Sequence, residues 1–160
     1  MVREPTFSPA EAAAITGVST ALQRKWRSAG GPLEPKDNPG WTRWTPKELA
    51  RLLVLDRVSR LVGPAQAATM IAAAGNQGVD GLVWAFAISS AIPGKMDELT
   101  EKVGRFVVSK DSAPFLAYRS LANAVDGAAV PWIVLDAQAL GVHLAQAVGT
   151  PLVFGVEVAQ

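Results

Sequence analysis

The chain has 160 residues, of which 49% are hydrophobic and 18% are charged, a composition typical of a folded protein. It contains no cysteine, which excludes disulfides and thiolate metal sites. The N-terminal residues lack the apolar run of a signal peptide. The most apolar stretch, residues 81–92, is far shorter than the roughly 20 residues that cross a bilayer. We therefore expect a soluble, cytoplasmic protein.

The charges are unevenly distributed along the chain. Residues 1–62 contain ten basic and six acidic side chains, which gives +4, whereas residues 63–160 contain five basic and eight acidic ones, which gives −3. The two parts sum to the net charge of +1. A basic front part indicates contact with a polyanion, although four charges alone do not identify it.

Two short helices joined by a glycine turn are predicted near the N-terminus. Ser8 is a suitable N-cap, and Glu11 follows at the capping-box position. This first helix should stop at Gly17, and a second, capped by Ser19, should run over residues 20–28. The small core between them is expected to contain Ala12, Ala13, Ile15, Val18, Leu22 and Trp26. Such a pair is typical of a helix-turn-helix.

Turn-forming residues over 32–44, with Asn38-Pro39-Gly40 at the tip, predict a two-stranded hairpin, or wing. Thr45 and Glu48 then form a second capping box, which begins a helix that should end at Gly63. Further helices are predicted over 65–74, 79–92, 95–103 and 137–148, and strands over 105–109, 131–135 and 151–158, while 115–118 is either a strand or a loop. The pattern predicts an α+β protein: a winged helix-turn-helix (1–74), a helical connector and a small C-terminal α/β domain (79–160).

Three blocks in the front part occur in an informative order and spacing: residues 7–19, residues 22–27 (Leu-Gln-Arg-Lys-Trp-Arg) and residues 40–52. They resemble the MerR-type winged helix, and more loosely the winged domains of phage excisionases and small terminase subunits. The resemblance covers residues 7–63. It implies that the arginines at the positions of Arg24 and Arg43 contact DNA, and that the aromatic residues at the positions of Trp26, Trp41 and Trp44 pack the helices and hairpin together. Lys25 stands where the family usually has an aromatic residue, and no sustained heptad pattern follows Pro64.

A recognition helix reads the major groove, where every base pair presents a distinct pattern. In the second helix, Thr20, Gln23, Arg24 and Arg27 are three or four residues apart and are expected to share the reading face. Lys36 and Arg43 lie on the predicted wing, where positive charge would meet the phosphate backbone. The candidate DNA-binding residues are Ser19, Thr20, Gln23, Arg24, Lys25, Arg27, Lys36 and Arg43.

The sequence shows no residue pattern that would support an enzyme activity. The sequence has no nucleophile elbow, phosphate loop or metal-ligand spacing, and His143 is its only histidine. We therefore expect neither a catalytic activity nor a cofactor nor a metal site.

The sequence predicts a sequence-specific regulator of transcription from a bacterium or a phage, with double-stranded DNA as its partner. Because winged domains usually reach useful specificity by pairing half-sites, the chain is expected to form at least a dimer through residues 79–160. The alternatives are an excisionase-like or packaging factor that marks DNA for a machine, and a winged helix that serves only protein contacts.

Overall fold

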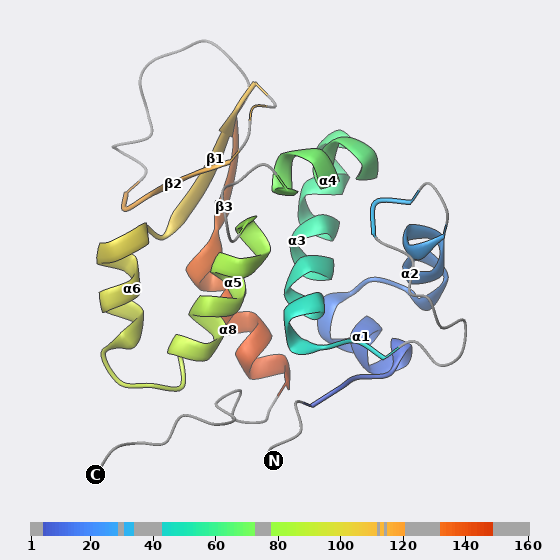
Figure 1. The fold of residues 1–160 in the computed structure, drawn as a ribbon, viewed down its shortest axis with the longest axis horizontal. Coiled ribbons are helices and arrows are strands. Elements are labelled where there is room, and N and C mark those ends of the chain that lie inside the picture. The colour runs from blue at the N-terminus through green and yellow to red at the C-terminus, as the bar shows by residue number, and fades with distance from the viewer. Residues whose placement is uncertain are drawn as a thin grey trace.

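The chain folds into a mixed arrangement of helices and a small antiparallel sheet (Figure 1). The computed structural model describes residues 5–28, 31–33, 43–72, 78–111, 113, 115–120 and 132–148. The elements are α1 (Pro9–Thr16), α2 (Thr20–Arg27), α3 (Pro46–Val62), α4 (Pro64–Ala72), α5 (Gly78–Ser89), α6 (Lys95–Val103), β1 (Phe106–Lys110), β2 (Leu116–Tyr118), β3 (Trp132–Asp136) and α8 (Ala137–Val148). The predicted combination of helices and strands is confirmed at this level.

Both predicted capping boxes are confirmed. At the start of α1, the Ser8 N–H donates to Glu11 Oε2 at 2.6 Å, and the Glu11 N–H donates to Ser8 Oγ at 3.2 Å. At the start of α3, the corresponding bonds join Thr45 and Glu48 at 2.7 and 3.3 Å. Gly17 ends α1 in the left-handed conformation, with a φ of 79° that favours glycine. These helix boundaries follow from local hydrogen bonding alone.

The turn between α1 and α2 is built around a buried threonine. The Thr16 hydroxyl donates to the Ala12 carbonyl at 2.7 Å, and the Val18 N–H donates back to that hydroxyl at 3.3 Å. Beside the turn, Phe7 and Trp44 exchange two backbone hydrogen bonds of 2.8 Å in an isolated antiparallel bridge. The bridge ties the chain entering α1 to the chain entering α3. Most of the predicted hairpin, residues 34–42, lies outside the described residues.

Helix α3 forms the centre of the molecule. It is buried along most of its length and packs against α1, α4 and α5, while α8 packs on α5 and also contacts α1 and α3 (Figure 1). The predicted apolar helix of residues 79–92 is α5, which ends at Ser89 and packs on α3, α6 and α8, with Trp84, Ala85 and Ile88 half-buried. Helices α5 and α8 lie so close together that a Cβ added to Gly141 of α8 would stand 2.5 Å from Phe86 Cβ of α5.

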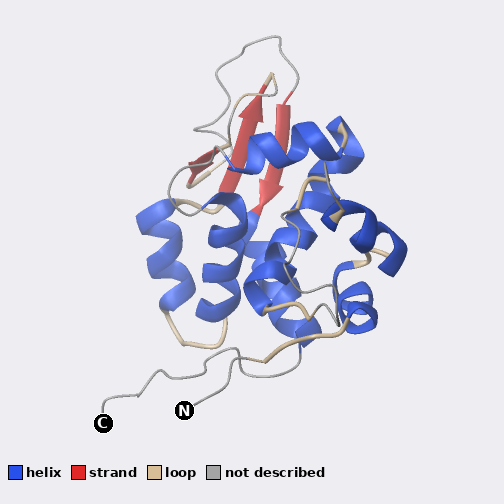
Figure 2. Cartoon of the chain, turned by 45° about the vertical axis from the view of Figure 1, so that its right-hand side comes forward, coloured by secondary structure: helices blue, strands red, loops and turns tan. Residues whose placement is uncertain are grey.

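The sheet has the order β2-β1-β3, with both pairs antiparallel. Figure 2 shows the strands gathered at one end of the molecule, beyond the ends of α5 and α8. Phe106 is paired with Asp136 and Lys110 with Trp132 across β1 and β3. The predicted strand over 151–158 lies outside the described residues.

The buried apolar residues form one cluster that runs through both parts of the chain. It includes Ala12, Val18 and Trp26 from the front part and Phe86 and Leu144 from the back part. The division into residues 1–74 and 79–160 thus remains a prediction, and the core contains residues from both sides of it. Within the described residues, no helix is long and apolar enough to cross a membrane.

Candidate nucleic-acid interface

One face of α2 anchors this helix to the rest of the molecule. Gln23 and Trp26 are buried, with 2% and 3% of their surfaces exposed. The Gln23 side-chain amide donates two hydrogen bonds of 2.9 Å, to the carbonyls of Pro9 and Val18. The side chain of Gln23 therefore joins α2 to the first turn of α1 and to the connecting turn, which fixes the angle between the two helices.

Arg27 forms a second anchor, between α2 and α3. Its guanidinium carbon lies 3.5 Å from the centroid of the Trp44 ring, and Nη2 lies 3.3 Å from Glu48 Oε1. Only 11% of the Arg27 side chain is exposed. Burial lowers the pKa of Arg27 from its usual value while Glu48 opposes that shift, and an arginine in such a setting stays charged. Glu48 also accepts the Thr45 N–H through Oε2, so one carboxylate holds both the start of α3 and α2.

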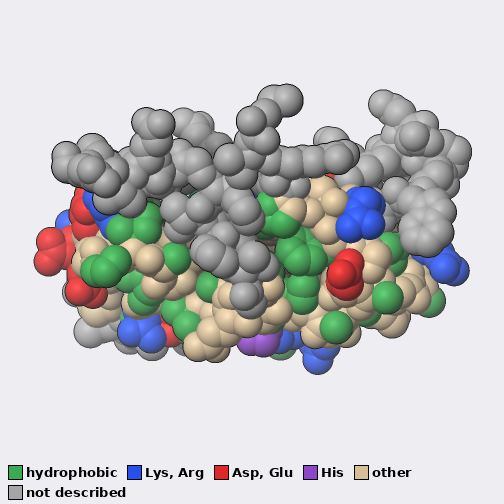
Figure 3. All heavy atoms as spheres, turned by 90° about the horizontal axis from the view of Figure 1, so that it is seen from below, with side chains coloured by type: hydrophobic (Ala, Val, Ile, Leu, Met, Phe, Trp, Pro, Cys, Tyr) green, Lys and Arg blue, Asp and Glu red, His purple; other side chains and the backbone are tan. Residues whose placement is uncertain are grey.

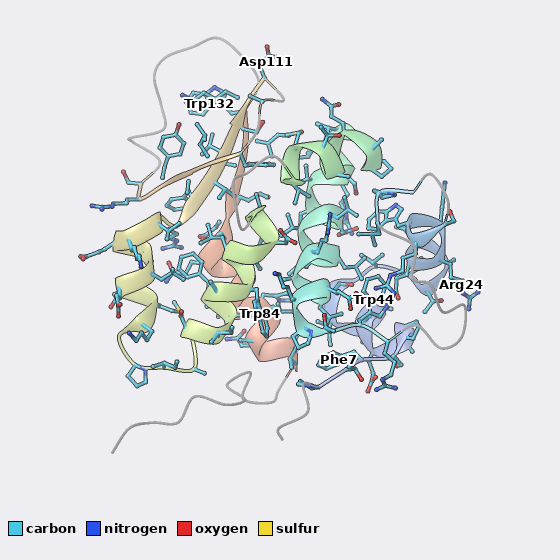
Figure 4. All side chains as sticks on the ribbon, in the orientation of Figure 1. Phe7, Arg24, Trp44, Trp84, Asp111 and Trp132 are labelled. Atoms are coloured by element: carbon cyan, nitrogen blue, oxygen red, sulfur yellow. The ribbon has the colours of Figure 1, made fainter. Side chains whose placement is uncertain are left out.

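The opposite face of α2 is exposed to solvent. Its residues are Ala21, Arg24 and Lys25, which follow the i, i+3, i+4 spacing of one helix face, and the C-cap residue Ser28 lies on the same side. Figure 4 shows Arg24 at the outer side of α2, away from α3. The Ser28 hydroxyl donates to the Lys25 carbonyl at 2.6 Å, which closes the end of the helix. We refer to these four residues as the outer face of α2.

The structure corrects the expected reading face. Gln23 is buried and hydrogen-bonded, and Arg27 is stacked and ion-paired, so neither side chain points outward. Thr20 is half-buried, and only Arg24 of the expected set is fully on the outer face. The observed face is turned by one residue, or about 100°, from the expected one.

The other candidate residues are distributed around this face. Ser19 is exposed and acts as the N-cap of α2, because its Oγ accepts the Leu22 N–H at 3.2 Å. Lys25 is exposed on the outer face, and Lys36 lies outside the described residues. Arg43 is exposed, and it donates to the hydroxyl of Thr6 at 2.6 Å and to its carbonyl at 2.7 Å. Arg43 is thus held against the N-terminal segment.

The sequence marks the outward side of α2 only in part. Leu22 and Trp26 are apolar and four residues apart, so together they mark the side of α2 that faces the core. At about 100° per residue, Arg24 lies opposite to this pair, whereas Ala21 and Arg27 are about equally far from that opposite side. The sequence therefore places Arg24 outward but does not separate Ala21 from Arg27, and Ala21 and Ser28 were not among the candidates because neither is charged.

A cleft of about 520 Å³ opens between the end of α2 and the start of α4. Its lining residues are Lys25, Trp26, Ser28, Gly31, Pro32, Pro64, Ala65 and Ala68. Two residues of the outer face therefore form part of its rim. Most of the wall is apolar, in contrast to the outer face of α2.

No group of three or more histidine, cysteine, aspartate or glutamate side chains that could hold a metal ion occurs within the described ranges. His143, on α8, is exposed; it is the single histidine of the chain and is visible at the surface in Figure 3. Comparison of the chain with family models, with curated proteins and with solved structures finds no match. The inference of a function thus depends on the geometry of the chain itself.

Proposed function

We propose that the protein binds double-stranded DNA in a sequence-specific manner, as a regulator of transcription in a bacterium or a phage. In this proposal α1 and α2 act as a helix-turn-helix, and the segment between α2 and α3 acts as its wing. The observation that carries the proposal is the division of α2 into two faces. One face anchors the helix through Gln23, Trp26 and Arg27, and the other presents Arg24 and Lys25 to solvent.

This division suits insertion into a major groove. A helix that enters the groove must expose several long polar side chains on one side and be held rigidly on the other. The anchors of α2 connect it to α1 through Gln23 and to α3 through Arg27, so its orientation is fixed before DNA is met. Arginine pairs with guanine through two hydrogen bonds, and lysine neutralises phosphate as a compact charge.

Arg43 supports the proposal from a second position. It immediately precedes the Phe7–Trp44 bridge and is exposed. In the proposed complex it contacts the phosphate backbone beside the groove that α2 occupies. The basic balance of residues 1–62, at +4, favours the approach of this side of the chain to DNA.

The protein acts as at least a dimer in this proposal, because a single small module makes a contact of limited specificity. Helix α5 packs on α3 and α8 within the subunit, and its half-buried residues Trp84, Ala85 and Ile88 remain candidates for the contact, together with other parts of residues 79–160.

The test is selection of bound sequences from a random duplex library, followed by titration of the selected duplex by fluorescence anisotropy. Arg24→Ala is expected to weaken binding to the selected duplex about 5- to 150-fold, the equivalent of one bidentate base contact. Arg43→Ala is expected to weaken binding to all duplexes alike and to reduce the salt slope by about one unit. Arg119→Ala removes an exposed arginine from a site remote from α2 in sequence, after β2, and serves as the matched control. Equal affinities for the parent protein and Arg24→Ala would refute the proposal.

A further inference from the structure

We propose that Ala21 and Arg24 together read a thymine and a guanine that lie within one or two base pairs of each other. This inference rests on the proposed function and names part of the sequence that the protein prefers. It depends on the outer face of α2 that the structure shows. The face expected from the sequence would instead have made Gln23 and Arg27 contact the bases.

Ala21 lies at the N-terminal end of the outer face. Ala21 lies in the first turn of α2 and Arg24 one turn later, and both are exposed on the same side. Recognition helices contact base edges mainly with their N-terminal residues. Lys25 and Ser28 are the later members of the face and border the cleft toward α4, so they lie farther from the N-terminal end. Ala21 and Arg24 are therefore the two side chains placed for base contact.

The two side chains differ in the chemistry that they offer to a base edge. Ala21 offers only a methyl group, and the one apolar group on the floor of the major groove is the 5-methyl of thymine. Arg24 offers a planar fork of donors, which matches O6 and N7 of guanine. The short side chain of Ala21 also lets the backbone of α2 approach the bases closely at this point.

The spacing of the two side chains along α2 limits how far apart the two bases can lie. Ala21 and Arg24 are three residues apart, which corresponds to about 4.5 Å along the helix axis. Successive bases of one strand are about 3.4 Å apart along the duplex. Side chains with this separation reach the same base pair step or the next one, which sets the limit of one or two base pairs.

The other polar residues of α2 and its caps suit other contacts. Ser19 Oγ accepts the Leu22 N–H, which leaves its hydroxyl hydrogen for a phosphate oxygen, and Thr20 is half-buried. The hydroxyl hydrogen of Ser28 is used in the bond to the Lys25 carbonyl, so Ser28 does not donate to a base or a phosphate in this conformation. Lys25 provides a charge for the backbone and not a bidentate contact.

The experiment uses the full-length protein and modified versions of the selected duplex, in each of which one base lacks a single chemical group. Replacing the thymine by deoxyuridine removes only its methyl group, and replacing the guanine by 7-deazaguanine removes only N7. Deoxyuridine is expected to weaken binding of the parent protein about fourfold, from the burial of one methyl-sized group, and to leave the binding of Ala21→Gly unchanged. The parent protein is expected to bind the 7-deazaguanine duplex at least about tenfold more weakly than the unmodified duplex. Arg24→Ala is expected to bind both duplexes with the same affinity.

Ala21→Ser provides a second variant, because it keeps more helix propensity than glycine while replacing the methyl group. It should show the same insensitivity to deoxyuridine, and circular dichroism establishes that each variant is folded. An equal loss on deoxyuridine in the parent and in both Ala21 variants would overturn the assignment of Ala21. Selected duplexes with no thymine near a guanine would overturn the inference as a whole. Failure to select any preferred duplex would instead refute the proposed function, so the two failures are distinguishable.

Discussion

Replacing Arg27 by alanine tests whether this residue anchors α2 or reads DNA. Its stacking on Trp44 in a largely desolvated setting contributes about 1–2 kcal/mol. The ion pair with Glu48, whose side chain is 32% exposed, adds up to about 1 kcal/mol. Truncation also uncovers the Trp44 ring, which is now 2% exposed. Against these terms, Nη1 of Arg27 is buried and has no hydrogen-bond partner among the described residues, so its removal recovers about 1 kcal/mol.

The net expectation is a loss of about 2 kcal/mol in the free energy of unfolding, or about 4–8 °C in the melting temperature of a chain of this size. Thermal unfolding followed by circular dichroism measures the loss, with Arg24→Ala as the matched control, since that side chain is exposed and should leave the melting temperature within about 1–2 °C. At a temperature where both variants are folded, Arg27→Ala should retain more DNA affinity than Arg24→Ala. An unchanged melting temperature together with a large loss of DNA affinity would show that Arg27 faces the DNA and that the anchoring argument is wrong.

Four further outcomes are expected. Gly141→Ala should destabilise the fold by about 1–3 kcal/mol, because the new Cβ would stand 2.5 Å from Phe86 Cβ; an unchanged melting temperature would contradict the packing of α8 on α5. Burial opposes ionisation of Asp136 and is the largest single effect on its pKa, but the hydrogen bonds from Arg105 and from the backbone N–H groups of Ala139 and Gln138, together with the charge of Arg105, outweigh it and lower the pKa. The contribution of Asp136 to stability is therefore present above its ordinary pKa and is lost as the pH falls through the lowered pKa. Acidification should thus destabilise Asp136→Asn less than the parent. Parallel curves of unfolding free energy against pH for the two proteins would exclude this role. Thr45→Ala should cost about 1 kcal/mol in unfolding experiments, and Thr45→Ser, which keeps the cap, should cost little; equal losses would show that the cap is not the cause. Light scattering of the full-length protein at micromolar concentration should give at least a dimer, and a monomeric mass would contradict the proposed assembly.

The helix starts could be predicted because their signals are local. Each capping box, Ser8 with Glu11 and Thr45 with Glu48, joins two residues that are three apart in the sequence. The residue types and their spacing are therefore enough to predict where the helix begins. The strands predicted over 105–109 and 131–135 lie within one residue of β1 and β3, and α8 was predicted with its observed bounds, whereas the sequence did not decide whether 115–118 is a strand. The order β2-β1-β3 was not, because strand pairing joins segments that lie far apart along the chain.

The orientation of α2 shows where sequence reasoning failed. The charges of Arg24 and Arg27 were given equal weight, although only tertiary packing decides which of them faces solvent. Trp44 was correctly expected in the core, and it is this ring that holds Arg27 inward. A charged side chain next to a large aromatic partner from another element is the case in which residue type predicts exposure poorly.

The two-sided construction of α2 has a consequence for how the specificity of this protein could change. Residues that hold the helix and residues that meet solvent occupy different positions, with Gln23, Trp26 and Arg27 on one side and the outer face on the other. Substitutions of Ala21, Arg24 and Lys25 leave every anchoring contact intact, whereas Ser28 closes the end of the helix through its bond to the Lys25 carbonyl. In the proposed complex, a library restricted to the first three positions therefore explores new preferences on an unchanged scaffold, and natural variants drift in preference by the same route.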